Sequence, residues 1–347
     1  QADLSKARQV IEALQLRELD NFFQDACLEA SPVQIDQIDP QAAAIYPIIL
    51  SDRLEVILSL PDGSLDRYST PLSAAQVEQT LQKFYSSLYP GYSDRERLQL
   101  SREIYDWVVR PAEADLEKFN VKTLAFVLDG FFQSIPMAAL HDGQKYLIEN
   151  YAVTLSPGLQ LFPEGLQRRD SQMLAAGLTK ARDGFDPLPG VELEIDRISE
   201  GFEGKILLNE GFTRNAFQAE IDVKSFPIVH LATHGQFSSD PEKTFLLAWD
   251  ERINVRDFTE MFQLRQREND PVELLVLSAC QTATGDRRAT LGLAGFALRS
   301  GARSTVATLW SVNDLSTADL MVEFYDRIAR PDVPKAEALR QAQLTLL

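Results

Sequence analysis

Short apolar runs alternate with amphipathic stretches over most of the chain from residue 121 onward. The runs have the length and the β-branched content of strands, and the stretches between them have the three- and four-residue apolar spacing of helices. Strands that alternate with helices are typical of a mostly parallel sheet. The predicted strands are residues 123–128, 151–155, 172–176, 205–208, 228–233, 245–249, 274–279 and 305–309.

Amphipathic periodicity predicts helices in most of the intervals between these strands and at the end of the chain. They are residues 193–202, 213–221, 255–262, 291–300, 314–330 and 334–347. The polar stretch 264–270, which has the sequence LRQREND, is expected to be an exposed loop.

The chain before residue 121 has a different pattern. Residues 4–25 have helical apolar spacing, and three short runs with hairpin turn signals between them predict a small antiparallel meander. Two helices are expected next, the first with Ser73 as its N-cap and the second divided by Pro111. The three runs are residues 44–50, 53–60 and 65–69, and the two helices are residues 73–88 and 95–120.

This change of pattern predicts two regions, an N-terminal α+β segment at residues 1–120 and an α/β domain at residues 121–347. The helix at 4–25 is compatible with the last helix of an upstream helical array, but one helix does not establish a repeat. Because the sequence begins at Gln1 rather than at methionine, we expect it to be a piece of a longer protein.

Composition narrows the possible functions. The net charge of −17 and the pI near 4.7 argue against binding to nucleic acid or to anionic membranes, which would repel the protein. No apolar run approaches the ~20 residues that a membrane-spanning helix needs. The two cysteines, Cys27 and Cys280, are too far apart in sequence to suggest a disulfide framework, so we expect a reducing cytoplasm. The phosphate-binding G-x-x-x-x-G-K-[ST] and G-x-G-x-x-G motifs and the G-x-S-x-G motif of serine hydrolases are absent from the sequence.

A cysteine follows one of the predicted strands. The apolar run at 274–277 gives way at Ser278-Ala279-Cys280 to small and polar residues, which places Cys280 at the carboxyl end of the sheet, where open α/β sheets bind ligands. A free cysteine is also commonly a buried small hydrophobic residue. Judged by itself, Cys280 leaves both interpretations open.

A second predicted strand ends in a histidine and a glycine. The segment 228–237, IVHLATHGQF, places His234 and Gly235 at the same edge of a parallel sheet as Cys280. The thiolate is the nucleophilic form of cysteine and needs a base beside it, because a free thiol has a pKa of about 8.5. We therefore predict a catalytic pair of His234 and Cys280. Gly235 lets a substrate approach the backbone, and the amides of Gly235 and Cys280 are predicted to form an oxyanion hole.

The other histidines have simpler interpretations. His230 and His234 have the spacing of a helical metal pair, but on a strand four residues span roughly 13 Å, so no metal site and no cofactor are expected. His230 lies within the apolar run and is predicted to be a hydrogen-bonded core histidine. His141, in a His-Asp-Gly turn, is expected to be a solvated loop residue.

Other polar and aromatic residues lie at or near predicted strand ends. Trp310 and Asp314 follow the strand at 305–309 and are candidates for the wall of a substrate pocket, although Asp314 fits equally well as the N-cap of the next helix. Asp129 and Asp286 lie at or near other strand ends. This acidic surplus predicts a preference for a basic residue on the amino side of the scissile bond.

These segments resemble the motif blocks of the CHAT family, caspase-like cysteine peptidases that are often fused to tetratricopeptide repeats. The similar blocks are HLATHG, LLVLSACQTATG, GLAGFALRSGARSTVATLWSVND and LMVEFYDRIAR, with LAFVLDGFFQSIPMAALHDGQKYLIENYAVTLSPG and LPGVELEIDRI upstream. The resemblance runs from about residue 120 to the end. The preceding part is similar to the region before this domain in cyanobacterial members.

The resemblance implies a caspase-like (haemoglobinase-type) α/β/α sandwich with a mostly parallel sheet, preceded by a small α+β segment. It also implies a cysteine endopeptidase with His234 as general base and Cys280 as nucleophile, acting through an acyl-enzyme on a protein substrate. Upstream tetratricopeptide repeats or a regulatory partner are expected with it. A catalytically silent scaffold with the same fold is the main alternative, and a different thiol hydrolase or acyltransferase is a third.

The chain departs from the family pattern in two places. Family members usually continue past the final helix into an aromatic-rich strand, whereas this sequence stops at Leu347. The block after the cysteine is often acidic in the family, and here it contains Asp286-Arg287-Arg288. The end of the domain and the loop after the nucleophile are therefore expected to differ from other members.

Overall fold

The computed structural model describes residues 2–23, 39–89, 91–156, 172–238, 240–267, 271–278, 281–282, 293, 297, 300–308, 312–330 and 332–347. The chain divides into two compact units, residues 1–163 and residues 164–347. Among the described residues, no helix has both the length and the apolar character needed to cross a membrane.

The first unit is built on a five-stranded sheet in the order β3-β2-β1-β4-β5. Strands β1, β2 and β3 form the predicted antiparallel meander, whereas β4 pairs parallel to β1 and β5 parallel to β4. The strands are β1 (Ala42–Ile49), β2 (Leu54–Ser59), β3 (Leu65–Thr70), β4 (Thr123–Phe126) and β5 (Ala152–Leu155). This one sheet therefore contains strands from both sides of residue 120.

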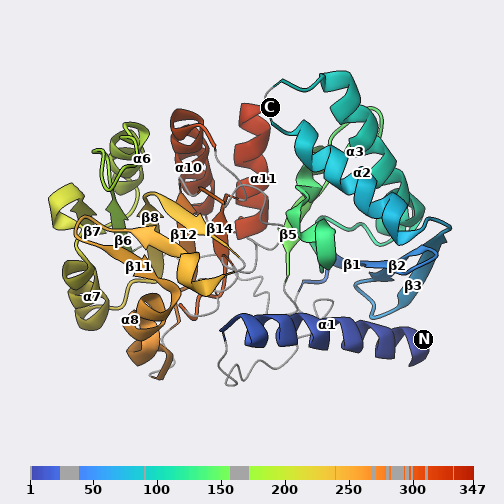
Figure 1. Ribbon diagram of the computed structural model, residues 1–347, viewed down its shortest axis with the longest axis horizontal. Coiled ribbons are helices and arrows are strands. Elements are labelled where there is room, and N and C mark those ends of the chain that lie inside the picture. Colours follow the sequence, from blue (N-terminus) through green and yellow to red (C-terminus); the bar gives the residue numbers. More distant parts are fainter. Residues whose placement is uncertain are drawn as a thin grey trace. The chain divides into compact units, whose positions relative to one another are not determined.

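Helices cover both faces of this sheet (Figure 1). Side chains of α2 and α3 pack with one face, and Ile11 of α1 packs against the other. The predicted cap at Ser73 is confirmed, since its hydroxyl accepts from the Gln76 amide and the Gln76 side chain accepts from the Ser73 amide. Pro111 divides the next helical segment as predicted. The helices are α1 (Ala2–Phe23), α2 (Ala74–Ser87), α3 (Asp94–Val108), α4 (Glu113–Lys118) and α5 (Leu147–Asn150), with 3-10 turns η2 (Arg110–Ala112), η3 (Gly130–Ser134) and η4 (Met137–Ala139).

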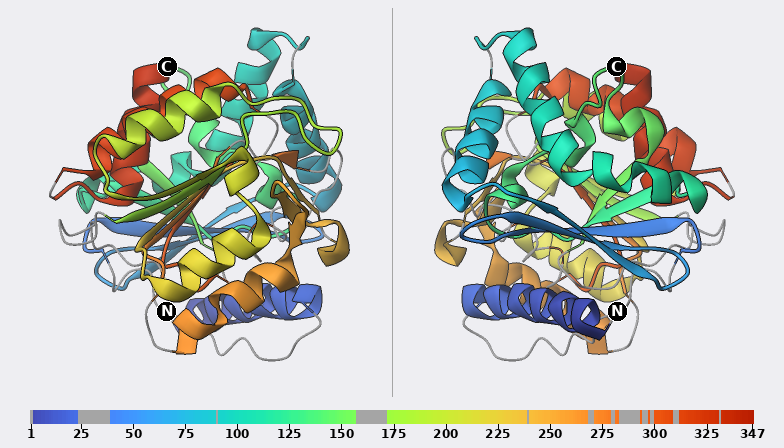
Figure 2. Two further views of the ribbon diagram at one scale, coloured as in Figure 1. Left: turned by 90° about the vertical axis from the view of Figure 1, so that its left-hand side faces the viewer. Right: turned by 90° about the vertical axis from the view of Figure 1, so that its right-hand side faces the viewer.

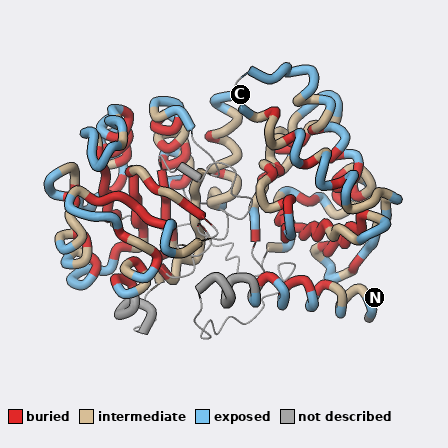
Figure 3. The backbone as a smooth tube through the Cα atoms, in the orientation of Figure 1, coloured by how far each residue is buried: buried red, intermediate tan, exposed pale blue. Residues whose placement is uncertain are grey.

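The second unit is built on a fully parallel five-stranded sheet in the order β14-β12-β8-β6-β7. All five strands were predicted from their apolar runs. They are β6 (Met173–Gly177), β7 (Gly204–Leu208), β8 (Ile228–Ala232), β12 (Leu274–Ser278) and β14 (Thr305–Ala307). The central strands β8 and β12 are buried along their whole length (Figure 3), as continuous apolar runs require.

Helices also lie on both faces of this sheet (Figures 1 and 2). Helices α6 and α10 pack on one face, α11 packs beside α10, and α7 and α8 lie on the other face. Their bounds are α6 (Gly190–Ser199), α7 (Arg214–Val223), α8 (Val255–Arg267), α10 (Asp314–Ile328) and α11 (Lys335–Leu346), and η6 (Asn209–Gly211) and η7 (Pro241–Lys243) are 3-10 turns. The predicted mixed α/β fold with a parallel sheet is confirmed.

One prediction of secondary structure is wrong in part, and another falls mostly on residues outside those described. The stretch 264–270 was predicted as a loop, but α8 continues to Arg267, because Leu, Arg and Gln are good helix formers. Residues 268–270, and most of the predicted helix at 291–300, lie outside the described residues.

A second, smaller sheet extends from the same two central strands. Its order is β11-β10-β9-β13, and it contains the predicted run at 245–249 as an antiparallel strand rather than as a member of the main sheet. Its strands are β9 (Gly235–Phe237), β10 (Phe245–Leu247), β11 (Arg252–Asn254) and β13 (Gln281–Thr282). Strand β9 follows β8 and strand β13 follows β12, so the two chain segments that pair in the main sheet pair again in the smaller one.

Candidate active site

His234 lies at the carboxyl end of β8, between the main sheet and the smaller one. Its neighbour Thr233 is fully buried and is bound on both sides: its amide donates to Ser278 O at 3.3 Å, and its hydroxyl donates to Leu247 O at 2.7 Å. The carbonyl of His234 accepts from the Leu247 amide at 2.8 Å. These bonds fix the backbone at the histidine while its side chain stays half-buried.

The His234 ring is held by the loop that connects β6 to α6. Nε2 lies 2.7 Å from the carbonyl oxygen of Asp186, and the Phe185 ring stacks on the imidazole with a centroid separation of 4.8 Å. A carbonyl oxygen only accepts hydrogen bonds, so Nε2 carries the proton of this contact. In the neutral imidazole, Nδ1 is therefore the unprotonated nitrogen, available as a base.

A tight turn brings Phe185 to the histidine. Arg182 and Phe185 exchange backbone hydrogen bonds of 3.2 and 2.9 Å, with Asp183 at φ 50° and Gly184 at φ 83° between them. Two central residues with positive φ are the type I′ pattern of two-residue hairpins. Aspartate and glycine are residues that adopt this left-handed conformation most readily.

Charged and aromatic contacts hold this turn in place. Asp183 pairs with Arg252 at 2.7 Å, and the Arg252 guanidinium lies 4.5 Å from the centroid of the Phe245 ring, which in turn meets Phe185 edge-on. The guanidinium of Arg182 lies 4.8 Å from the centroid of the Trp249 ring. Such cation–π contacts contribute about 0.5–1 kcal/mol each at exposed sites.

The two ends of the loop are fixed as well. At its start, Asn209 Oδ1 accepts from the amides of Thr179 and Lys180 at 3.0 and 3.2 Å. At its end, the Gly190 amide donates to Asp314 Oδ2 at 2.5 Å. The backbone carbonyl of Asp186 is thus presented to the histidine by a loop with several fixed points.

The backbone on either side of Cys280 is described, whereas Cys280 itself lies outside the described residues. Ser278 is in register with Ala232, and Gln281 is in register with Gln236. Three residues, 233–235, connect the paired positions on the histidine side, and two, 279–280, connect them on the cysteine side. The histidine side therefore has one residue more than the cysteine side between the two sets of paired positions. One extra residue on one of two paired strands is what defines a β-bulge.

His230 is a core histidine, as predicted. Its ring is fully buried, with Nδ1 3.1 Å from the Tyr325 hydroxyl and Nε2 3.0 Å from Glu194 Oε1. It belongs to strand β8, so the helical spacing of a metal pair with His234 does not apply. In the part of the chain that the structure describes, no cluster of three or more His, Cys, Asp or Glu residues is placed to hold a metal ion.

The predicted pocket residues have different positions. Asp314 is the first residue of α10, and its carboxylate binds the amino end of α6, while the N-cap of α10 is Asn313. Asp129 lies in the first unit, exposed, with its carboxylate accepting from the Gly130 amide at 2.7 Å. His141 lies in its predicted turn, where Nδ1 accepts from the Gly143 amide at 3.0 Å. Trp310 and Asp286 lie outside the described residues.

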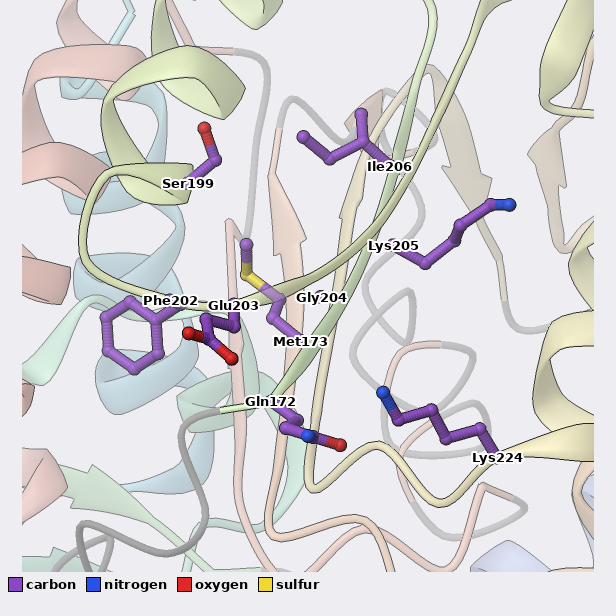
Figure 4. Close-up of a pocket in the computed structure, with 9 residues that line it drawn as sticks. All are labelled: Gln172, Met173, Ser199, Phe202, Glu203, Gly204, Lys205, Ile206 and Lys224. Atoms are coloured by element: carbon purple, nitrogen blue, oxygen red, sulfur yellow. The ribbon is translucent and has the colours of Figure 1, made fainter.

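A hollow of about 430 Å³ lies at the opposite edge of the main sheet (Figure 4), at the amino ends of β6 and β7. Lys205 and Lys224 line it, but Lys205 pairs with Glu220 at 3.0 Å and the Lys224 ammonium lies 5.3 Å from the centroid of the Phe226 ring. Its described lining holds no histidine or cysteine. The hollow is therefore separate from the histidine site.

The prediction from sequence did not include Phe185, Asp186 or Glu194. A local signal exists for the first two, since Asp183-Gly184 is a strong two-residue hairpin signal. The contribution of Asp186 is a backbone carbonyl, which no side-chain pattern reveals. Glu194 lies three residues after Val191 and four before Ile198, which places a carboxylate on the apolar face of α6.

Comparison with known protein families gives one match. The family model of the CHAT domain matches residues 98–347, which is well over half of the chain and begins within α3. No curated protein shows significant similarity to the chain.

Proposed function

The chain belongs to the CHAT domain family, and from that premise we propose that it is a cysteine endopeptidase in which His234 and Cys280 cleave a peptide bond. The family is related to the caspase-like cysteine peptidases. The caspase-like α/β/α sandwich belongs to the proposal, supported by the helices on both faces of the parallel sheet.

One observation carries the proposal: the chain segments of His234 and Cys280 pair on both sides of these residues. Ser278, two positions before the cysteine, pairs with Ala232, two positions before the histidine. Gln281, directly after the cysteine, pairs with Gln236, two positions after the histidine. Consecutive Cα atoms are about 3.8 Å apart, so these pairings support a thiol and an imidazole within reach of each other.

The proposed reaction uses the free nitrogen of His234. Nδ1 takes the proton of the Cys280 thiol, and the thiolate attacks the carbonyl carbon of the substrate peptide bond. The amides of Gly235 and Cys280 donate to the oxygen that becomes negative. The imidazolium then returns the proton to the leaving amine, and water hydrolyses the thioester with His234 again acting as base.

The Asp186 carbonyl supports this cycle by orienting the base. Because it accepts from Nε2, it keeps the ring in the tautomer with Nδ1 free and stabilises the imidazolium that forms in the reaction. The stacked Phe185 ring restricts rotation of the imidazole. The base is therefore positioned before substrate binds.

Several further features belong to the proposal. Cleavage after a basic residue is proposed from the acidic surplus of the sequence, and Asp129, Trp310 and Asp314 are kept as candidate pocket residues. A cytoplasmic location is proposed from the two widely separated cysteines. Association with tetratricopeptide repeats is proposed from the family to which the chain belongs. We also propose an N-terminal segment at 1–120 and a peptidase domain at 121–347.

The proposal is tested by profiling the new N-termini that the protein creates in a peptide mixture prepared from a cell lysate. Cys280→Ala and His234→Ala are each expected to lower their yield by about 10²–10⁴-fold. Cys27→Ala and His141→Ala are the matched controls and should leave the yield unchanged. If all five proteins gave the same profile, the protein would not be a peptidase using this pair.

A second experiment distinguishes the proposed peptidase from a catalytically silent scaffold with the same fold. A peptide with an electrophilic carboxyl end should modify Cys280 in the wild type, and His234→Ala should lose that modification at neutral pH. A scaffold would show no dependence of Cys280 modification on His234. If the protein cleaved preferentially after acidic residues, the proposed preference for a basic residue would be wrong, and the proposed catalytic pair would be unaffected.

A further inference from the structure

A buried carboxylate lies beneath the proposed active site. Glu194 of α6 is 1% exposed, and its two oxygens point to the two central strands of the sheet. Oε1 lies 3.0 Å from Nε2 of His230 on β8, and Oε2 accepts from the Ser278 hydroxyl on β12 at 3.1 Å. One carboxylate thus connects one helix and two neighbouring strands.

The fourth member of this cluster is Tyr325 of α10. Its hydroxyl lies 3.1 Å from Nδ1 of His230. Burial, and then the nearby Glu194 carboxylate, raise the pKa of Tyr325 well above 10, so the phenol keeps its proton. In the tautomer in which Tyr325 donates to Nδ1, the proton of neutral His230 is on Nε2, the nitrogen that lies 3.0 Å from Glu194 Oε1.

Each partner of Glu194 lies a short distance along the chain from a group of the active site. His230 precedes His234 by four residues, and Ser278 precedes Cys280 by two. Glu194 itself follows Asp186 by eight residues and lies in the first two turns of the helix to which the Asp186 loop leads. The carboxylate therefore lies within 3.0 Å of the strand that leads to the base and accepts a hydrogen bond from the strand that leads to the nucleophile. Its own helix follows the loop whose carbonyl orients the base.

The surroundings of this cluster are apolar. Val191, Ile195, Ala232 and Val276 belong to the same buried core. A buried charge is costly to desolvate, and replacing such a group by apolar residues is often neutral or stabilising. In some proteins such polar groups in a core give conformational specificity, which here means one fixed arrangement of α6, β8 and β12.

We propose that Glu194 is a positioning residue for the thiol–imidazole pair, through its contacts with His230 and Ser278. The inference rests on the proposed function, since it concerns the same pair. Glu194 touches neither substrate nor reacting atoms. Its effect is expected on the alignment of His234 with Cys280, and therefore on how readily the thiolate forms near neutral pH.

The test measures alkylation of Cys280 by iodoacetamide, a small reagent that needs no substrate pocket, by mass analysis of the peptide that carries this residue. Rates are compared at pH 6.5 and pH 9.5. A cysteine without a base has a pKa of about 8.5 and should slow down about 100-fold between these values, whereas an aligned pair should slow down much less. The ratio of the two rates therefore reports the alignment.

Glu194→Gln keeps the size of the side chain but replaces one acceptor oxygen by a donor. It is expected to lower the rate at pH 6.5 by about tenfold and to leave the rate at pH 9.5 unchanged. Glu12→Gln is the matched control, because Glu12 is also a buried carboxylate, accepting from Tyr46 in the first unit. It should leave the ratio at the wild-type value.

Ser278→Ala is the second variant, and it removes one donor with the least change of volume. It is expected to shift the ratio in the same direction, by a smaller factor. If either variant, folded as judged by circular dichroism, kept the wild-type ratio while His234→Ala lost it, the positioning role would be refuted and the proposed function would stand. If the wild-type rate fell about 100-fold between pH 9.5 and pH 6.5, as for a cysteine without a base, and His234→Ala did not change this ratio, the proposed function itself would be refuted.

Discussion

Nε2 of His234 and the backbone carbonyl oxygen of Asp186 lie 2.7 Å apart, although 48 residues separate them in the sequence. The contact assigns the ring proton to Nε2 and leaves Nδ1 as the base. It depends on a loop that returns from β6 over the end of β8, so the state of the histidine is determined by a segment other than its own strand.

The stacking of Phe185 on His234 gives a first prediction. Phe185→Ala removes a contact of about 0.5–1.5 kcal/mol, which corresponds to up to about tenfold in rate. Alkylation of Cys280 at pH 6.5 should fall by about that factor, with no change at pH 9.5. Phe185→Tyr keeps the ring and should behave as the wild type. Equal effects of the two substitutions would contradict a role for the stacked ring.

Gly177, at the end of β6, gives a second prediction. A Cβ there would lie 2.7 Å from Val191 Cγ1 and 2.8 Å from the backbone oxygen of Ala232. Gly177→Ala should therefore lower the free energy of unfolding by about 1–3 kcal/mol, the usual effect of overpacking. Gly211→Ala, where a Cβ would meet nothing within 4 Å, is the control and should stay within about 0.5 kcal/mol. Chemical denaturation of both variants measures the difference.

The ion pair of Asp183 and Arg252 gives a third prediction. Both side chains are about half exposed, so a double-mutant cycle with Asp183→Asn and Arg252→Gln should give a coupling of about 0.2–1 kcal/mol. Asparagine retains the left-handed turn conformation, so the cycle isolates the charge. The coupling should largely disappear in about 1 M salt. A coupling above about 2 kcal/mol, or one unaffected by salt, would mean that the pair is not simply a surface contact.

The tyrosines of the first unit predict a loss of stability at alkaline pH. Burial, and then the hydrogen bond with Tyr89, raise the pKa of Tyr85 to about 12. Burial also raises the pKa values of Tyr68 and Tyr105, which donate to Asp115 and Glu113. An unfolded phenol loses its proton near pH 10, so between about pH 10 and 12 unfolding releases protons and the free energy of unfolding falls as pH rises.

This stability is fully present below about pH 10. Denaturation midpoints measured at pH 9 and pH 11 should therefore differ, and Tyr85→Phe should reduce the difference. The control is Tyr92→Phe, because Tyr92 is 48% exposed. A midpoint that stayed constant up to pH 11 would show that the folded and unfolded chains bind the same number of protons.

Much of the fold follows from local patterns. The apolar runs of β8 and β12 predicted buried parallel strands, and Ser73 was predicted as the N-cap of the helix that is α2. The pairing of β4 with β1 was not foreseen, because Thr123 meets Ala42 across 81 residues and no local pattern encodes such a partner. The core position of His230 was predicted from its apolar neighbours.

The site was predictable only in part, for a related reason. His234 and Gly235 were identified from a strand end, but the carbonyl of Asp186 has no side-chain signature, and its role depends on long-range packing. Glu194 was hidden because a glutamate in a helix normally faces solvent. Only its place among Val191, Ile195 and Ile198 distinguishes it.

The one-residue offset between the paired ladders constrains how relatives of this chain can vary. Ala232 and Gln236 are four positions apart, whereas their partners Ser278 and Gln281 are three apart. A one-residue deletion within 233–235, or a one-residue insertion between 279 and 280, would make the two connecting segments equal in length. The register of β9 against β13 would then shift by one residue, and the side chains of one of these strands would turn to the opposite face. Homologous sequences that keep both ladders should therefore show insertions and deletions in the surrounding loops, but a constant difference of one residue between these two short connections.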